Sequence, residues 1–347
     1  MDQGRYIRQT TLTEFGVKGQ EELSKASVVI IGCGGLGSIV GPYLAGAGVG
    51  KIKLVDGDKP QLSNLHRQVF YTTNDYNESK AILLKRHLEK LNPESDVSAF
   101  DFHISKNNIS ELIHENDIVV ECSDNIQCKY LVNDYCHLYH IPLVYGSIYK
   151  FEGHVSFFRN RSFEDVHLRD AFPEIQEDIP TCSEVGVVNT IAGIIGLLQA
   201  NEVIKYLAGL GNPLVSELLI YNVLDNEQVK LKLKKNWRND ISNVYEKTNY
   251  EPQTCHPDFE LDIGFLRKNL NQFQIVSILE DEEHVDIFDD TIHQPYSTIK
   301  ADDWVNFTKP VVFYCTAGIR SGHLVSNLRN KNASGKFYSL KNGINTF

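Results

Sequence analysis

The residues of this chain that could do chemistry begin with a glycine-rich turn. The turn, Gly32-Cys33-Gly34-Gly35-Leu36-Gly37, comes directly after the apolar residues 28–31, and an apolar segment follows it. Glycines permit a tight turn and a close approach of the backbone to a phosphate, and the N-terminus of the next helix attracts anions. The same spacing serves dinucleotide enzymes, nucleotide enzymes and purely structural turns, so the turn alone does not identify its ligand.

Charged side chains downstream of the turn narrow the choice of ligand. Asp56 ends the next apolar segment, about 20 residues past the glycines, where an acid commonly binds ribose hydroxyls. Arg67 and Lys80 could neutralise a triphosphate, the first through its bidentate guanidinium and the second as a point charge. Asp124 follows a later apolar segment and is placed to hold magnesium. Each alone could be a turn residue, a surface charge or a helix cap, but together they favour ATP with magnesium over NAD.

Alternating strands and helices are the elements that must position these side chains. Strands are predicted over residues 28–31, 51–56, near 97, 117–121 and 143–145, and helices over 36–47, 79–91, near 109 and 126–139. This alternation predicts an α/β fold with a doubly wound, mostly parallel sheet. Strands over residues 152–159, 218–221 and 228–233 predict an antiparallel extension, with a long helix over 187–208.

Composition excludes several classes of protein. The net charge of −11 argues against a nucleic-acid partner, which would require a basic surface. Seven cysteines, an odd number spread over 347 residues, do not suggest a disulfide framework and favour a reducing, cytoplasmic setting. Residues 1–5 lack the apolar core of a signal peptide. Polar residues interrupt the longest apolar stretch, 187–207, so we expect a buried helix there and no membrane span.

The chain resembles the ThiF/MoeB/HesA adenylyltransferases, relatives of the ubiquitin-activating enzymes, over about residues 5–234. The motifs that carry the resemblance, specific as a set in this order, are Arg5-Tyr6-x-Arg8-Gln9, Gly32-x-Gly34-Gly35-Leu36-Gly37, Asp56-x-Asp58, Ser63-Asn64-Leu65-x-Arg67-Gln68, Lys80, Cys122-Ser123-Asp124-Asn125, Thr181-Cys182 and Gly196-x-x-Gln199-Ala200-x-Glu202. The resemblance implies that the protein uses ATP and Mg²⁺ to adenylate the C-terminal glycine of a ubiquitin-like sulfur carrier protein.

The resemblance also implies roles for individual residues. Asp56 would hold the ribose, Asp124 the magnesium ion, and Arg8 would reach into the site of the partner subunit, which implies a homodimer. The expected nucleotide-binding residues are Arg8, Gly32, Gly34, Gly35, Gly37, Asp56, Asp58, Ser63, Asn64, Arg67, Gln68, Lys80, Asp124 and Asn125. The expected catalytic residues are Arg67, Lys80, Asp124, Cys182 and Cys315.

Cys182 follows Thr181 in a polar loop that leads into a helix. A thiol at a helix N-terminus has a lowered pKa and is a better nucleophile. In the family that the chain resembles, the cysteine at this position can form a thioester or persulfide link with the carrier. The alternative is a buried structural cysteine.

One departure from the family concerns zinc. Many relatives carry two Cys-x-x-Cys pairs that hold a structural zinc ion. His167-x-x-Asp170 occupies the place of the first pair here, and nothing replaces the second near residues 237–240. Two ligands without partners are a poor zinc site, so we expect no structural zinc.

A polar segment over residues 235–258 predicts a linker between a domain of residues 1–234 and a smaller α/β domain of residues 259–347. In the smaller domain, Cys315-x-x-Gly318-x-Arg320-Ser321 follows an apolar strand and resembles the rhodanese active-site loop. Backbone N–H groups in such a loop point at the cysteine and favour a thiolate or a bound persulfide. Ser277-Ile278-Leu279 replaces the usual Asp-x-Arg, and the usual Gly-His-Ile is missing near residues 291–295, so a pure docking role stays open.

The leading hypothesis is a two-domain enzyme that activates a sulfur carrier. The first domain adenylates the carrier, and a Cys315 persulfide supplies the sulfur of a thiocarboxylate for molybdopterin, thiamine thiazole or thiolated tRNA. A cysteine desulfurase is the expected sulfur donor. One alternative, an NAD-dependent oxidoreductase, leaves Arg67, Lys80 and Asp124 unused. Another, a non-catalytic scaffold that binds the carrier, does not explain the intact set of phosphate-binding residues.

Overall fold

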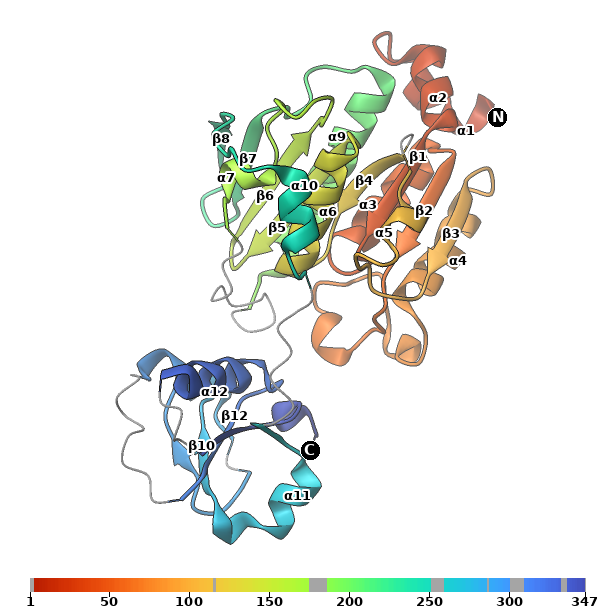
Figure 1. Ribbon diagram of the computed structural model, residues 1–347. Coiled ribbons are helices and arrows are strands. Elements are labelled where there is room, and N and C mark those ends of the chain that lie inside the picture. Colours follow the sequence, from red (N-terminus) through yellow and green to blue (C-terminus); the bar gives the residue numbers. More distant parts are fainter. Residues whose placement is uncertain are drawn as a thin grey trace. The chain divides into compact units, whose positions relative to one another are not determined.

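The computed structural model describes residues 3–114, 117–174, 186–250, 259–285, 287–299, 309–331 and 336–346. The chain forms two compact units, residues 1–251 and 252–347, and each has its own sheet (Figure 1). The first unit takes in most of the segment that the sequence suggested as a linker. Trp237, Ile241 and Tyr250 explain this extension, because their side chains are buried against the first unit.

The first unit is built on an eight-stranded sheet in the order β3-β2-β1-β4-β5-β6-β7-β8. Its parallel strands are β1 (Ser27–Ile31), β2 (Lys51–Val55), β3 (Asp96–Phe100), β4 (Asp117–Glu121) and β5 (Leu143–Tyr149). Its antiparallel extension consists of β6 (Glu152–Phe158), β7 (Glu217–Asn222) and β8 (Glu227–Lys232). The predicted fold class, a mostly parallel α/β sheet with an antiparallel extension, is confirmed.

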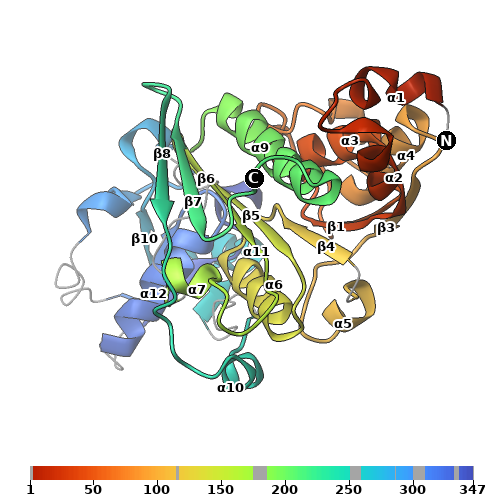
Figure 2. The same cartoon turned by 90° about the horizontal axis from the view of Figure 1, so that it is seen from above.

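Helices cover both faces of this sheet. The described helices are α1 (Gln3–Thr10), α2 (Gly16–Lys25), α3 (Gly37–Ala47), α4 (Lys80–Leu91), α5 (Ile109–Leu112), α6 (Ile126–Leu138), α7 (Leu168–Ala171), α9 (Asn189–Ala208) and α10 (Ile241–Lys247). Figure 2 shows α3, α4 and α9 on one face and α6 and α10 on the other. Val28 and Ile30 of β1 therefore enter one apolar core, while Val29 and Ile31 enter the second. A strand covered on both faces is apolar throughout, as residues 28–31 are.

Among the described residues, α9 is the one helix that is long and apolar enough to cross a membrane, judged by length and composition only. Its packing explains this composition, because Ile191, Ile195 and Val203 are fully buried in the first core. Gly196 lets α9 approach α3 closely: a Cβ atom there would lie 2.9 Å from the Leu36 carbonyl oxygen. The prediction of a buried helix agrees with this packing.

The three strands that carry the predicted site end at one level of the sheet. Ile31 at the end of β1 is paired with Val55 on β2 and with Glu121 on β4. The chain therefore leaves all three strands side by side. The strand order also reverses here, because β1 lies between β2 and β4, and ligands of open α/β sheets bind at such a switch point.

The second unit contains a smaller parallel sheet in the order β11-β10-β12-β13-β9. Its strands are β9 (Glu260–Leu261), β10 (Gln274–Ser277), β11 (Ile292–His293), β12 (Val311–Tyr314) and β13 (Phe337–Leu340), and its helices include α11 (Ile263–Lys268) and α12 (Ile319–Lys331). Two small apolar clusters form its core, and Val312 and Phe313 of β12 enter different ones. The strand predicted just before Cys315 is confirmed as β12.

Candidate functional site

The glycine turn after β1 lies directly against the turn that follows β4. Gly32 has a φ of +89°, and a Cβ atom there would lie 2.8 Å from the Ser123 nitrogen and 2.9 Å from the Cys122 carbonyl. Its N–H donates to the Val55 carbonyl at 2.8 Å. A side chain is therefore excluded by both the backbone conformation and the neighbouring backbone. Gly32, Gly34 and Gly35 are partly exposed, so the turn keeps backbone that a phosphate can approach.

Asp56 fixes the glycine turn to the end of β2. Its carboxylate accepts hydrogen bonds from the Cys33 N–H at 2.6 Å and the Asp58 N–H at 2.7 Å. Burial raises the pKa of this carboxyl, and the charge of Lys80 opposes the rise. Because each carboxylate oxygen has a further lone pair, Asp56 can hold the turn and still accept a ribose hydroxyl.

Lys80 begins α4, as predicted, and lies almost fully buried beside the same turn. Its ammonium group is 3.4 Å from a carboxylate oxygen of Asp58, which is exposed. The Tyr71 hydroxyl lies 2.7 Å from the Cys33 carbonyl oxygen and 3.2 Å from that of Lys80. Tyr71 thus links the glycine turn to the start of α4. Sequence reasoning missed it, because a tyrosine inside a polar loop gives no signal of a long-range contact.

Arg67 and Gln68 are buried in the loop between β2 and α4, while Ser63 is exposed and Asn64 half-buried. The Arg67 guanidinium lies 3.3 Å from the Ser63 carbonyl oxygen and makes no ion pair within the part of the chain that the structure describes. The Gln68 side-chain oxygen is buried without a hydrogen-bond partner. Its amide nitrogen would lie 3.2 Å from a Cβ atom on Gly34. A cation without an acid and an unused acceptor beside the glycines fit a polyphosphate nucleotide.

Asp124 is exposed after β4 and makes no hydrogen bond or ion pair with the residues that the structure describes. Asn125, not Asp124, caps α6: its side chain accepts a hydrogen bond from the Cys128 N–H at 2.8 Å. The alternative of Asp124 as a helix cap is therefore excluded. Magnesium in proteins is typically held by one or two carboxylates together with substrate phosphates, so a free Asp124 beside the glycine turn fits this ion.

The N-terminal motif contains three residues that hydrogen-bond to the rest of the first unit and one exposed arginine, Arg8. Arg5 donates to the Leu91 carbonyl at 2.9 Å, and Gln9 donates to the Ala47 carbonyl at 3.0 Å. Tyr6 is buried and accepts a hydrogen bond from Asn92 at 2.8 Å. Arg8, on the same short helix, is exposed and has no partner among the described residues. The three hydrogen-bonded residues hold α1 on the first unit and leave the Arg8 guanidinium available to another molecule.

The predicted nucleophile Cys182 and its neighbour Thr181 lie outside the described residues. Cys33 and Cys122, which are within them, are buried beside the site. Burial raises the pKa of both thiols well above the usual range, with nearby carboxylates adding to the effect. Both therefore stay protonated at neutral pH and are poor nucleophiles.

The residues at the place of the family's zinc ion do not fit a zinc site. Asp170 accepts hydrogen bonds from the N–H groups of Asn236 and Trp237, each at 2.8 Å, and from that of His167 at 3.0 Å. His167 stacks on His137 with ring centroids 4.0 Å apart, and burial lowers its pKa to about 2. The described part of the chain holds no cluster of three or more His, Cys, Asp or Glu for a metal ion. Through these hydrogen bonds the Asp170 carboxylate links α7 to residues 236–237. The absence of zinc stays a prediction.

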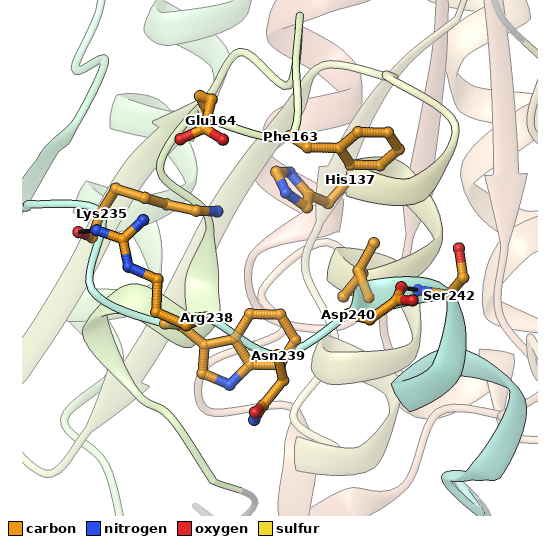
Figure 3. Close-up of a pocket in the computed structure, with 10 residues that line it drawn as sticks. His137, Phe163, Glu164, Lys235, Arg238, Asn239, Asp240 and Ser242 are labelled. Carbon is orange, nitrogen blue, oxygen red and sulfur yellow. Dashed lines mark hydrogen bonds between the residues drawn. The ribbon is translucent and has the colours of Figure 1, made fainter.

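A cavity of about 320 Å³ lies beside this cluster and shares no residue with the predicted nucleotide site (Figure 3). In the figure, the Lys235 side chain points toward the ring of His137. Both charge signs line the cavity, because Lys235 and Arg238 as well as Glu164 and Asp240 are among its lining residues. A second cavity, of about 480 Å³, is lined mainly by residues of β6 to β8 and of the segment after β8.

Cys315 lies at the carboxyl end of β12 in a loop that leads into α12. Its sulfur is 3.5 Å from both the backbone nitrogen, which donates to it, and the hydroxyl oxygen of Ser321. The thiol is buried. Arg320 points to other partners, the Glu283 carboxylate at 2.7 Å and the Thr316 hydroxyl at 3.0 Å. The loop thus provides one backbone donor to the sulfur, while an acid pairs with the arginine.

The place of the missing Asp-x-Arg is filled by buried residues. Ser277 ends β10, with its hydroxyl 3.4 Å from a ring nitrogen of His284. Leu279 is fully buried in an apolar cluster that also contains Tyr314. An apolar side chain has replaced the arginine of the rhodanese pattern, so this unit lacks a second cation from β10.

Comparison with known proteins establishes the family. The model of the ThiF family matches residues 6–241, about two thirds of the chain. The chain belongs to the ThiF family. The glycine turn, the buried cations and Asp124 lie within the matched residues.

Several relatives of this ThiF-family chain have adenylyltransferase names. The sulfur carrier protein adenylyltransferase of Thermus thermophilus is 41% identical over 239 residues, which cover 67% of this chain and 88% of the relative. The probable molybdopterin-synthase adenylyltransferase of Porphyra purpurea is 31% identical, covering 99% of this chain and 92% of the relative. The adenylyltransferase and sulfurtransferase MOCS3 of Xenopus laevis is 40% identical, but the match covers about half of it (52%).

Solved structures support the fold. The crystal structure of E. coli MccB with ATP matches with a TM-score of 0.58 and 24% identity, covering 67% of this chain and 71% of MccB. At this level of identity the likeness concerns the fold alone.

Replacing Gly32 by alanine is expected to destabilise the protein by about 2 kcal/mol or more, because its φ is positive and the new Cβ would meet backbone on the β4 side. Nucleotide binding should fall with it. Gly46→Ala is the matched control: nothing lies within 4 Å of its Cβ position in α3, so stability should hold or rise by up to about 1 kcal/mol. Urea unfolding and nucleotide titration measure both. Equal stability of the two variants would contradict the close contact.

Proposed function

We propose that this protein is an adenylyltransferase that uses ATP and Mg²⁺ to adenylate the C-terminal glycine of a ubiquitin-like sulfur carrier protein, and that its second unit supplies sulfur to the activated carrier. The observation that carries the proposal is the convergence of a partly exposed glycine turn with the buried cations Arg67 and Lys80 at one edge of the sheet. The names of the relatives supply the substrate class.

The site has the groups that adenylation requires. The phosphates of ATP bind at the glycine turn and the N-terminus of α3, and Asp56 accepts the ribose hydroxyls. The carrier's terminal carboxylate attacks the α-phosphorus and pyrophosphate leaves, so Arg67 and Lys80 stabilise charge that develops on phosphate oxygens. The attacking carboxylate is already ionised at neutral pH, so no general base is needed. Magnesium held by Asp124 would neutralise phosphate charge.

The two alternative functions are not favoured. A hydride-transferring enzyme would have no use for a buried arginine and lysine beside the glycine turn. A scaffold would have no reason to keep the Arg67 guanidinium buried with no acidic partner in the described part of the chain, because an unpaired buried charge costs free energy. That cost is understandable where a triphosphate supplies the missing negative charge.

Sulfur transfer belongs to Cys315 in this proposal. A cysteine desulfurase loads the thiol as a persulfide, and the terminal sulfur replaces AMP on the carrier's carboxyl carbon. A thiol reductant then releases the carrier thiocarboxylate. The Ser321 N–H supports sulfur charge at this step, since it points at the cysteine. The pathway served is one that uses carrier-bound sulfur, in a reducing, cytoplasmic setting.

The proposed assembly is a homodimer with shared sites. Arg5, Tyr6 and Gln9 fix α1 on its own unit, while Arg8 is exposed and has no partner within the described ranges of the chain. An arginine placed in this way can pair with a triphosphate in a second copy of the chain.

Asp124→Ala is expected to lower carrier-dependent ATP–pyrophosphate exchange at least a hundredfold, because the phosphates lose their magnesium ligand. Stability should change by no more than about 0.5 kcal/mol, since Asp124 is exposed and unpaired. Asp225→Ala, which removes another exposed carboxylate in the turn between β7 and β8, should leave exchange unchanged. Full exchange in the Asp124 variant would rule out Asp124 as the magnesium ligand, and a wild-type protein without carrier-dependent exchange would favour the scaffold.

Arg8→Ala and Asp124→Ala chains, each nearly inactive alone, should recover exchange when unfolded, mixed and refolded together. In a mixed dimer one site carries both defects and the other carries none, so random pairing restores roughly a quarter of wild-type activity. A mixture no more active than its separate components would rule out the shared site.

Cys315→Ala should abolish formation of the carrier thiocarboxylate, followed by mass spectrometry of the carrier's C-terminus, while ATP–pyrophosphate exchange stays at the wild-type rate. Cys136→Ala is the matched control, since Cys136 is a buried cysteine of α6 whose thiol is kept protonated by burial. Thiocarboxylate formation in the Cys315 variant at the control's rate would show that the second unit only docks partners.

A further inference from the structure

A buried ion pair lies immediately before the turn that carries Asp124. Glu121, the last residue of β4, is fully buried, and Lys129, in α6, is 5% exposed. The Lys129 ammonium donates a hydrogen bond to the Glu121 carboxylate and another to the Gly146 carbonyl at 2.8 Å. Hydrophobic residues of similar volume would often stabilise a fold as well as such a pair, so its location needs an explanation other than stability.

The contacts of Glu121 fix the turn residue by residue. One carboxylate oxygen accepts the Ser123 N–H at 2.9 Å and also the Ser123 hydroxyl. The Cys122 N–H donates to the Ile31 carbonyl at 2.8 Å. The Gln199 side chain donates to the Glu121 carbonyl at 2.8 Å. Residues of β1, α6 and α9 thus form hydrogen bonds with the polar groups of Glu121 and Cys122, just before Asp124.

The turn between β4 and α6 is also confined by the neighbouring glycine turn. Gly32 lies so close that a Cβ atom would come within 2.9 Å of the backbone of Cys122 and Ser123. Asn125 fixes the other end by capping α6 through the Cys128 N–H. Between these fixed points, Asp124 is the exposed residue, and its carboxylate has no partner among the residues that the structure describes.

We propose that Glu121 and Lys129 are positioning residues for the magnesium ion: the buried pair fixes the β4–α6 turn so that the Asp124 carboxylate is held at the phosphate side of the glycine turn. This inference rests on the proposed function. Neither residue touches the nucleotide. The pair acts through the turn, as residues that hydrogen-bond to a metal ligand commonly do when they set its orientation.

The same helix offers a matched control. Arg169 makes two hydrogen bonds to Asp134 of α6, at 2.8 and 2.6 Å, and this pair is buried as well. It connects α6 to α7 and to the Tyr250 hydroxyl, not to the β4–α6 turn. Breaking either pair leaves a buried charge, but only the Glu121–Lys129 pair adjoins Asp124.

The test measures metal binding directly. Mn²⁺ is titrated, by electron paramagnetic resonance of the free ion, into protein that holds a non-hydrolysable ATP analogue. Lys129→Met should weaken Mn²⁺ binding roughly tenfold or more, as loss of such a support commonly does. Binding of the analogue without metal should be unchanged. Arg169→Met should lower the urea midpoint to a similar degree and leave Mn²⁺ affinity within a factor of two.

A double variant covers the case in which Lys129→Met does not fold. Glu121→Gln with Lys129→Met leaves no unpaired buried charge, and its Mn²⁺ affinity should still fall several-fold because no side chain connects residue 121 to Gly146. Wild-type affinity in a folded Lys129 variant, single or double, overturns the inference. Wild-type Mn²⁺ affinity in Asp124→Asn overturns the magnesium assignment itself, and a protein that fails to bind the analogue overturns the proposed function.

Discussion

The close contact between the glycine turn and the backbone after β4 is the constraint on which the site depends. Ile31, Val55 and Glu121 end their strands at one level, so three chain segments must leave the sheet side by side. A side chain at Gly32 would separate two of them. Because it is absent, Asp56, the glycine turn and Asp124, which are proposed to bind ribose, phosphates and magnesium, follow adjacent strands at the switch point of the sheet.

The buried charged residues at this edge of the sheet differ in how far neighbouring groups neutralise them. This difference separates residues that stabilise the site from residues that can bind an anionic ligand. Burial raises the pKa of Glu121, but the Lys129 charge and the hydrogen bonds from Lys129 and Ser123 oppose this effect. Lys80 faces two carboxylates, the buried Asp56 and the exposed Asp58, whereas Arg67 has carbonyl and imidazole neighbours. The Glu121–Lys129 pair maintains the shape of the site, whereas Arg67, with no acid among the described residues, retains positive charge for an anionic ligand.

Sequence reasoning recovered the parts of the site that depend on residue type and local order. Glycines after an apolar run and Lys80 at a helix start are local signals, and the structure places them as predicted. Tyr71 and the Glu121–Lys129 pair could not be found in this way, because their partners lie on other elements. Residues 235–250 look like a linker in composition, yet a few apolar side chains and the hydrogen bonds to Asp170 fold them onto the first unit.

The motif residues separate into two kinds once their contacts are known. Gln199 and Glu202 are buried and hydrogen-bonded, to the Glu121 carbonyl and the Leu214 N–H, so they position elements and need no ligand. Arg8 and Asp124 are exposed and have no partner within the described structure. A polar residue whose hydrogen bonds are all made within the protein supports the shape of a site. An exposed charged residue without such partners can bind a ligand or a second protein chain. By this criterion Arg320, paired with Glu283, must first exchange that acid for an anionic substrate before it can assist Cys315.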